Sequence, residues 1–326
     1  MKISVVIPAY KSLFLDKAIC SVVYQTYPNW ELVIVDDCSP EDIHNIVKPY
    51  LSDSRIRYYR NKSNCGAINL VDNWNICLSY CTGDYVICMG DDDILFPYCL
   101  EEYTKCIKKY PDVDVFYGET IIIDQHSKKI RNSQRHPEWE SVVDFLYNLW
   151  RGRDLFIGDV LIKTSRLKEI GGYVKYPLAW GSDHITTILA GERHGIVSTE
   201  KVVFQYRQHI GTLSLSKSQL EPKLLADEEV FDWYNHFINK QLKNGEAPTE
   251  TIKKLQMLYP RQKRYRIAWD LSEVFIFHPI GLIKAYTKTN NTNKDIKTLL
   301  LALYYSIRRG IQLPRICTKS YRDRKH

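Results

Sequence analysis

Three consecutive aspartates, Asp91, Asp92 and Asp93, follow a short apolar run and a glycine. Carboxylates gathered this closely repel one another, so a cation or solvent must separate them. Hard oxygen ligands on a short loop suit Mg²⁺ or Mn²⁺, which keep coordination positions open for phosphate oxygens. The alternative is a solvated acidic turn in front of a helix near Pro97, because acidic side chains favour helix N-termini. Both roles stay open from the triplet alone.

A second acidic pair, Asp36 and Asp37, ends another apolar run and precedes Cys38 and Ser39. One of these carboxylates could accept hydrogen bonds from a nucleobase N–H or a ribose hydroxyl. Ser39 or Asp37 could also cap a following helix, which is a common reason for such residues to follow a strand. The two roles are compatible.

The elements that position these residues alternate along the first 118 residues. Apolar runs predict strands at 3–7, 32–35, 56–59, 85–89 and 113–117, and helical spacing predicts helices at 13–25, 43–51, 67–81 and 97–109. This alternation is typical of a Rossmann-like α/β fold, a mostly parallel sheet with helices on both faces. Ligands of such sheets bind beyond the carboxyl ends of the strands. The loop after Pro8, Asp36–Ser39 and Gly90–Asp93 are therefore expected to form one site.

The rest of the chain has a different pattern. Residues 120–124 and 129–131 predict a hairpin, 141–150 and 183–193 predict helices, and 196–206 predicts a strand. From residue 217 the sequence is mainly helical and basic, with polar breaks near 244–248 and 287–293. We expect one domain over 1–216 and a helical C-terminal region over 217–326.

The net charge of +7 is concentrated at the end of the chain, where residues 251–326 hold 17 Lys and Arg against 4 Asp and Glu. A near-neutral front with a basic tail argues against a protein that coats nucleic acid. Within the tail, Leu299–Tyr305 is apolar and is followed by Arg308 and Arg309. That mixture fits a peripheral membrane contact, or equally a helical subdomain with a solvated basic face.

Cysteine usage and hydropathy indicate a cytoplasmic location. The nine cysteines contain no CxxC pair, and an odd, unframed set favours a reducing compartment. Only five apolar residues precede Pro8, which is too few for a signal peptide, and no run of 18 apolar residues exists. We expect a cytoplasmic protein. The basic tail suggests an alternative, in which the protein attaches peripherally to the cytoplasmic face of the membrane.

The stretches IPAYKSLFLDKAICSVVYQTYPNWELVIVDDCS and GDYVICMGDDDILFP resemble the opening of family 2 glycosyltransferases, which have the GT-A fold. The resemblance covers about residues 1–210 and is most specific in the first hundred. It divides the first domain into a nucleotide-binding half, 1–118, and an acceptor half, 119–216. It also implies that Pro8, Ala9 and Tyr10 border the nucleotide.

The family's acidic motifs imply further roles at the matching positions. Asp37 would hold the base, Asp91 would contact the ribose, and Asp92 would bind the metal that carries the diphosphate. The segment from Tyr206 to His209 resembles a family segment that closes over the diphosphate. His209 is therefore expected at the metal, and either Arg207 or His209 at the leaving group. The family often has Arg where this chain has Trp74, and for Trp74 we expect core packing.

The resemblance places the catalytic base at Asp183. The family usually has a Glu-Asp pair opening a helix there, whereas this chain has Ser182 and Asp183. A carboxylate is a competent base only if it reaches the acceptor hydroxyl. The structural alternative is an acidic residue in the first turn of a helix. Trp180 could stack on an acceptor sugar or pack in the interior.

These observations predict an inverting glycosyltransferase that uses Mn²⁺ or Mg²⁺. It would move one sugar from a nucleotide sugar to a glycan or lipid-linked saccharide in cell-surface polysaccharide synthesis. A UDP-sugar is the expected donor because UDP is the commoner nucleotide in the family. The processive Gln-x-x-Arg-Trp signature is absent. Two alternatives are a catalytically silent nucleotide-binding GT-A module and a nucleotidyltransferase. The latter usually has a Gly-rich basic loop after its first strand, and here Ala9–Ser12 contains no glycine.

Overall fold

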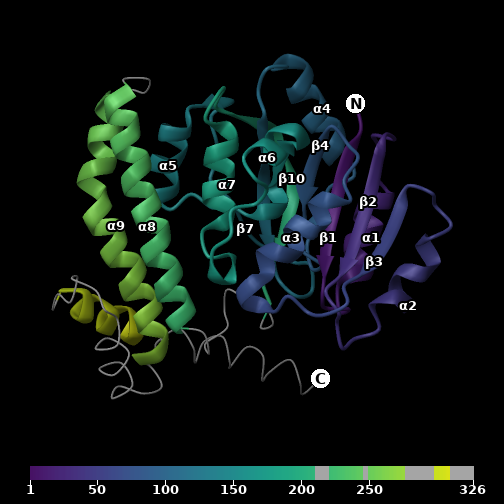
Figure 1. Cartoon of the computed structure of the whole chain (residues 1–326), viewed down its shortest axis with the longest axis horizontal. Coiled ribbons are helices and arrows are strands. Elements are labelled where there is room, and N and C mark those ends of the chain that lie inside the picture. Colours follow the sequence, from purple (N-terminus) through teal and green to yellow (C-terminus); the bar gives the residue numbers. More distant parts are fainter. Residues whose placement is uncertain (210–219, 245–248, 276–296, 309–326) are drawn as a thin grey trace. The chain divides into compact units, whose positions relative to one another are not determined.

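The computed structural model describes residues 1–209, 220–244, 249–275 and 297–308. They belong to two compact units, Met1–Leu213 and Ser214–His326 (Figure 1). The junction expected between residues 216 and 217 lies outside the described residues, as does the expected break at 287–293.

The first unit is built on one sheet with strand order β3-β2-β1-β4-β9-β6-β10-β5, with β7 paired to β6 and β8 to β10. The strands are β1 (Ile3–Ala9), β2 (Trp30–Asp36), β3 (Ile56–Arg60), β4 (Tyr85–Cys88), β5 (Ile94–Leu95), β6 (Val115–Ile123), β7 (Lys129–Asn132), β8 (Trp139–Glu140), β9 (Val160–Lys163) and β10 (Ile196–Arg207). The α-helices of this unit are α1 (Leu15–Val23), α2 (Ile43–Val47), α3 (Leu70–Ser79), α4 (Cys99–Lys109), α5 (Val142–Trp150), α6 (Thr164–Glu169) and α7 (Ser182–Gly191). Short 3₁₀ turns are η1 (Lys48–Tyr50), η2 (Ala67–Asn69), η3 (Ile157–Asp159) and η4 (Pro177–Ala179).

The N-terminal half of the sheet is parallel, as the alternating pattern predicts. β1 pairs with β2 on one side and β4 on the other, and β2 pairs with β3, all in parallel. β1 and β2 are almost wholly buried, which explains their continuous β-branched and apolar sequences. The predicted strands and helices of this half are therefore confirmed, to within a few residues at their ends.

Beyond β4 the sheet becomes mixed. β9 lies antiparallel between β4 and β6, and β6 is parallel to β10. The predicted hairpin is confirmed, because Ile121 pairs with Asn132 in an antiparallel ladder between β6 and β7. β9 was not expected, since its three apolar residues and Lys163 carry too little periodicity to be recognised.

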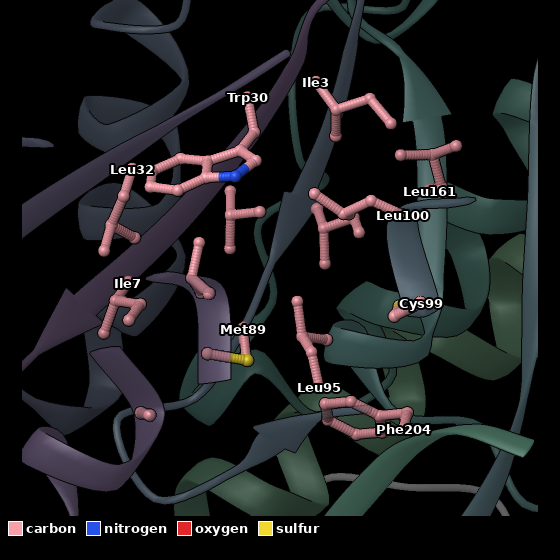
Figure 2. Packing of buried hydrophobic residues seen from close by; sticks show 14 of the residues in the cluster. Ile3, Ile7, Trp30, Leu32, Met89, Leu95, Cys99, Leu100, Leu161 and Phe204 are labelled. Carbon is pink, nitrogen blue, oxygen red and sulfur yellow. The ribbon is translucent and has the colours of Figure 1, made fainter. Parts of the chain in front are cut away.

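The core lies where the strands meet helices α1 and α4. Side chains of β1 that alternate along the strand, including Ile3 and Ile7, pack there with Trp30, Leu100 and Phe204 (Figure 2). Each such side chain, once buried, contributes about 1.5–3 kcal/mol. Helix α3 contacts β1 and β2 but contributes no member to this cluster, so helices cover both faces of the sheet.

The apolar face expected for the first helix is buried as predicted, except at its first residue. Ala18, Ile19 and Val22 are buried in α1, but Leu13 is 72% exposed. The helix begins only at Leu15, so Leu13 lies on the preceding turn and is not directed by helical spacing.

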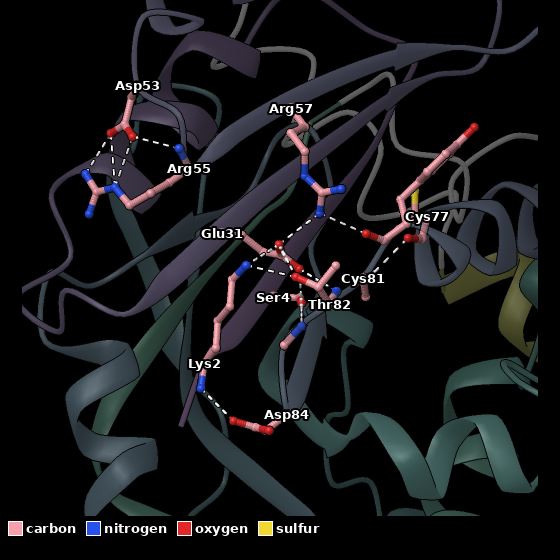
Figure 3. A network of polar contacts seen from close by, with 12 residues as sticks. Lys2, Ser4, Glu31, Asp53, Arg55, Arg57, Cys77, Cys81, Thr82 and Asp84 are labelled. Atoms are coloured by element: carbon pink, nitrogen blue, oxygen red, sulfur yellow. Dashed lines mark hydrogen bonds and ion pairs between the residues drawn. The ribbon is translucent and has the colours of Figure 1, made fainter.

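A buried carboxylate joins three strands at the far end of the parallel half. Glu31 of β2 accepts hydrogen bonds from Lys2, Ser4, Arg57 and Thr82 (Figure 3). Burial alone would raise its pKa, but hydrogen bonds from Lys2, Ser4 and Thr82 outweigh that effect and lower the pKa of Glu31 to about 2. The carboxylate is thus held ionised between β1, β2 and β3.

The second unit contains helices α8 (Leu220–Asn244) and α9 (Thr249–Phe275), which pack against each other, and residues 297–308 are also helical. Its small apolar core joins Leu224, Ala268, Leu271 and Ala302. The predicted helical C-terminal region is confirmed for these residues. Across the described ranges, no helix has both the length and the apolar character needed to cross a bilayer.

We predict that Glu31→Gln lowers the free energy of unfolding by about 2 kcal/mol at neutral pH, after allowing for solvent screening at this end of the sheet. Because the folded pKa is depressed to about 2 from an ordinary 4.5, the stabilisation is present above pH 4.5 and is lost as the pH falls toward 2. Urea unfolding of wild type and variant across this range measures the difference. The exposed Glu200→Gln is the matched control, and equal pH slopes for wild type and Glu31→Gln would contradict the prediction.

Candidate functional site

The carboxyl ends of β1, β2 and β4 meet at one edge of the sheet. Ala9 of β1 is in register with Asp36 of β2, and the Asp37 N–H donates to the Ala9 carbonyl at 2.9 Å. On the other side of β1, Met89 donates its N–H to Val6 at 2.9 Å, so the chain enters Gly90 beside the same edge. The three segments expected to form one site are therefore neighbours.

Asp91 connects the acidic turn to the loop after β1. Its Oδ2 accepts the backbone N–H groups of Tyr10 at 2.8 Å and Lys11 at 2.7 Å. Burial and the neighbouring Asp92 charge raise the pKa of Asp91 to about 6, although these two N–H groups act in the opposite direction. One oxygen thus fixes the loop, and Oδ1 is the atom left for a ligand.

The acidic turn is closely packed at its base. Asp93 is buried, and its Oδ1 accepts the Arg207 N–H at the end of β10 at 2.9 Å. Burial and the charge of Asp92 raise the pKa of Asp93 well above its usual range. A side chain at Gly90 would place its Cβ 2.9 Å from carboxylate oxygens of both Asp92 and Asp93, so only glycine fits there.

Asp92 is the member of the triplet that pairs with a side chain from another element. Its Oδ2 lies 2.8 Å from Nε2 of His209, and the ring of His209 packs edge-on against Phe14 with centroids 5.2 Å apart. Both side chains are mostly buried but reach the surface of a cavity. The structure therefore brings together the two residues expected at the metal.

A cavity of about 320 Å³ opens beside this pair. Its lining residues are Lys11, Leu13, Phe14, Glu41, Asp91, Asp92, Gln125 and His209. In the described ranges, no group of three or more His, Cys, Asp and Glu side chains forms a metal cage. A carboxylate and an imidazole on one wall do fit an octahedral ion that shares its other positions with water and phosphate oxygens.

Arg207 contacts the backbone of the acidic turn and does not line the cavity. Its guanidinium is buried and donates to the Asp92 carbonyl at 2.7 Å, to the Asp124 carbonyl at 3.1 Å and to Ser127 Oγ at 2.9 Å. It also lies 4.4 Å from the centre of the Phe14 ring. A role for Arg207 at the leaving group, considered from the sequence, does not agree with this burial.

Asp37 lies at the end of β2 and faces the segment after β3. Its Oδ1 accepts from Asn61 Nδ2 at 2.8 Å, and its carboxylate accepts the Cys65 N–H at 3.0–3.1 Å. The side chain of Ser39 turns away and donates to the Tyr10 carbonyl at 2.6 Å. Asp37 is thus placed at the same strand edge as Tyr10 but does not line the cavity with Asp92.

Asp183 lies in the first turn of α7, which follows a left-handed Gly181 at φ 91°. Its Oδ1 accepts the N–H of His184 at 2.8 Å. Ser182 is fully buried and its Oγ accepts the Tyr176 N–H at 3.2 Å, which holds the turn before the helix. Burial raises the pKa of Asp159 in η3 well above its usual range, and the charge of Asp183 adds to this effect.

The expected residues thus fall into groups. Asp91, Asp92 and His209 share the cavity, and Pro8, Ala9 and Tyr10 are joined to it through Asp91. Asp183 and Trp180, which follows η4, are not among its lining residues. Trp74 packs in the interior against Tyr173, as predicted.

Sequence reasoning missed several cavity residues: Lys11, Leu13, Phe14, Glu41 and Gln125. Lys11 and Glu41 adjoin motifs that it had recognised. Gln125 belongs to the turn of the β6–β7 hairpin, and a hairpin turn carries no signal for the direction in which it points.

Residues 4–162 match the family model described as Glycosyl transferase family 2. These residues form a domain of this family. An uncharacterized glycosyltransferase of Haemophilus influenzae is 24% identical over 313 residues, covering 94% of this chain and 86% of that protein. EpsE of Bacillus subtilis is 29% identical over 175 residues, covering 53% of this chain and 60% of EpsE. The chain thus spans less than two thirds of EpsE.

Two solved structures share the GT-A fold of this glycosyltransferase. S. aureus TarS 1-349 in complex with UDP-GlcNAc has a TM-score of 0.60 at 18% identity, covering 93% of this chain and 79% of that one. The mannosyltransferase PcManGT of Pyrobaculum calidifontis, in complex with GDP-Man and Mn²⁺, has a TM-score of 0.50 at 15% identity, covering 94% and 87%. The chain therefore shares the fold of these two proteins.

Proposed function

We propose that this chain moves a single sugar from a nucleotide sugar, a UDP-sugar by preference, to an acceptor hydroxyl with inversion at the anomeric carbon. The observation that carries the proposal is the pair of hydrogen bonds from Tyr10 and Lys11 to Asp91, which joins the nucleotide loop to the acidic turn. The UDP-GlcNAc complex of TarS supports a nucleotide-sugar donor.

On the donor side, the base lies at Asp37 and the ribose at Asp91, bordered by Pro8, Ala9 and Tyr10. Asp37 is buried and its carboxylate is fixed by two donors, so it offers an oriented acceptor to a base N–H. Asp91 has Oδ1 available for a ribose hydroxyl. The two carboxylates follow β2 and β4, which lie on either side of β1 in the sheet, and this separation suits the length of a nucleoside.

The diphosphate lies against Asp92 and His209. A Mn²⁺ or Mg²⁺ ion bound there would stabilise the charge that develops on the departing nucleotide. The protein's part is to hold the carboxylate and imidazole 2.8 Å apart, with Phe14 against the ring and the Arg207 guanidinium behind the turn. The Mn²⁺ of the PcManGT complex supports this choice of ion.

Asp183 is the catalytic base. It takes the proton of the acceptor hydroxyl as that oxygen attacks the anomeric carbon, and the nucleoside diphosphate leaves from the opposite face. Asp183 lies in the first turn of α7, where its Oδ1 accepts the His184 N–H. Trp180, three residues earlier, would stack on the acceptor sugar.

A catalytically silent nucleotide-binding module is the second candidate. Ser182 replaces the acidic residue that usually precedes the base, and its hydroxyl is occupied by the Tyr176 N–H. Such a module would bind nucleotide and release no sugar. A nucleotidyltransferase is less favoured, since Ala9–Ser12 contains no glycine.

We place the enzyme in the cytoplasm, acting on a glycan or lipid-linked saccharide of the cell surface. In the helix at 297–308, Leu300, Tyr304 and Ile307 are 53–58% exposed and lie along one face, while Tyr305 packs inward. This apolar stripe lies within residues 251–326, which hold 17 Lys and Arg against 4 Asp and Glu. An apolar stripe in a basic segment is suited to an anionic membrane surface. It would bring the site to a lipid-linked acceptor.

Asp92→Asn should abolish metal-dependent release of nucleotide. Purified protein is incubated with a panel of nucleotide sugars and Mn²⁺, with and without EDTA, and released nucleotide is measured. We expect release from one donor to fall about a hundredfold or more in the variant, because the metal loses its carboxylate. The exposed Asp112→Asn is the control. Nucleotide binding by calorimetry without release from any donor, in the presence of saccharide acceptors, would favour the silent module.

Asp183→Asn should reduce kcat by about a hundredfold or more while leaving the KM for the donor nearly unchanged. The amide keeps the size of the side chain and removes the proton acceptor. Steady-state kinetics with the donor and acceptor identified by the release assay measure both constants. Retention of wild-type kcat would exclude Asp183 as the base.

Replacing Leu300 and Ile307 together by Ser should weaken binding to phosphatidylglycerol vesicles about tenfold or more, since two apolar anchors are lost. Cosedimentation of the full chain with phosphatidylglycerol and phosphatidylcholine vesicles measures the effect. Met257→Ser, at a residue 79% exposed on α9, is the control. Equal binding of wild type to both vesicle types, or no loss in the double variant, would contradict the membrane contact.

A further inference from the structure

We propose that Asn61 and Asn73 are positioning residues that keep Asp37 a pure hydrogen-bond acceptor, so that the donor nucleotide must carry a base with a ring N–H. This inference rests on the proposed function, in which Asp37 meets the base. It adds a reason why some nucleotides would be accepted and others rejected.

The three side chains form a continuous hydrogen-bonded row. Asn61 Nδ2 donates to Asp37 Oδ1 at 2.8 Å and to Asn73 Oδ1 at 3.0 Å, and Asn73 Nδ2 donates to the Val35 carbonyl at 3.4 Å. Asp37 is 5% exposed and Asn73 only 1%. The row runs from the end of β2, across the residue after β3, to helix α3.

The direction of each amide follows from its neighbours. Asn73 must turn its NH₂ group toward Val35, because the opposite orientation would place two carbonyl oxygens against each other. Its Oδ1 therefore faces Asn61. To form a hydrogen bond with this oxygen, Asn61 must donate from its own NH₂ group. That group has two hydrogens, and the second is given to Asp37. The buried Asn73 thus determines what Asn61 presents to the carboxylate.

The other groups that contact Asp37 belong to Cys65 and are also donors: its backbone N–H and its thiol, whose pKa burial and the bond to Asp37 raise to about 12. The Cys65 N–H reaches Oδ1 at 3.0 Å and Oδ2 at 3.1 Å. The Asn61 amide and the Cys65 N–H both donate to the carboxylate, so Asp37 acts as an acceptor toward its surroundings. Oδ2 makes only the longer, shared bond, so it is the oxygen available to an incoming base.

A carboxylate that acts as an acceptor at this place selects bases by one ring atom. Uracil, thymine and guanine carry a ring N–H on their pairing edge and can donate to Oδ2. Cytosine and adenine have a bare ring nitrogen there, which would face the carboxylate as a second acceptor. A site built for a donor rejects an analogue that lacks it, because its buried acceptor is left unpaired.

Calorimetry with UDP, GDP, CDP and ADP in the presence of Mg²⁺ tests the inference on the full chain. We expect UDP or GDP to bind about tenfold or more tightly than CDP and ADP. In Asn61→Asp, the new carboxyl and Asp37 would share a proton, so Asp37 could act as a hydrogen-bond donor. The ratio of the affinity for UDP to the affinity for CDP should then fall about tenfold. Asn73→Ala, which frees the Asn61 amide to turn, should lower the ratio in the same direction.

Magnesium pyrophosphate is the probe that separates positioning from general damage. Its affinity should be unchanged in both variants, because it lacks a base, and the exposed Asn45→Ala should retain the wild-type ratio. If Asn73→Ala does not fold, the partly exposed Asn61→Asp decides the question. A folded Asn61→Asp with the wild-type ratio, or a wild type that prefers CDP or ADP, would overturn the inference. A wild type that binds no nucleoside diphosphate would overturn the proposed function itself.

Discussion

The site depends on one carboxylate oxygen that holds two backbone N–H groups. Asp91 Oδ2 accepts from Tyr10 and Lys11 and so fixes the loop after β1 to the turn after β4. Hydrogen bonds to a charged acceptor are about twice as strong as neutral ones, and this one is shielded from solvent. Without it, the nucleotide loop and the acidic turn would share a sheet edge but have no fixed distance between them.

The same turn concentrates negative charge that the protein only partly offsets. Asp91, Asp92 and Asp93 are adjacent, and burial raises the pKa values of the first and third. The guanidinium of Arg207 donates to the Asp92 carbonyl, and the Asp92 carboxylate lines the cavity. The proposed cation at Asp92 and His209 would offset this charge, and the free-energy cost of gathering the aspartates would be recovered when metal and diphosphate bind.

Much of the fold and part of the site could be predicted from sequence. Buried parallel strands leave continuous apolar runs, and the rule of strand ends then places Asp37 and Asp91 together. The short strand β9 left no periodic signal, and Leu13 was assigned to a helix that starts two residues later. The burial of Arg207 and the row of Asn61 and Asn73 depend on contacts between distant segments, which spacing along the chain does not encode.

The way Arg207 holds the β6–β7 turn has a consequence for how relatives of this enzyme can diversify. Arg207 binds the Asp124 carbonyl and the small hydroxyl of Ser127, so it fixes the path of the turn without using the side chains between them. Gln125 and His126 are exposed, and Gln125 lines the cavity. These two positions can therefore change identity at little cost in stability, and a new substrate preference can evolve there while the acidic turn stays as it is.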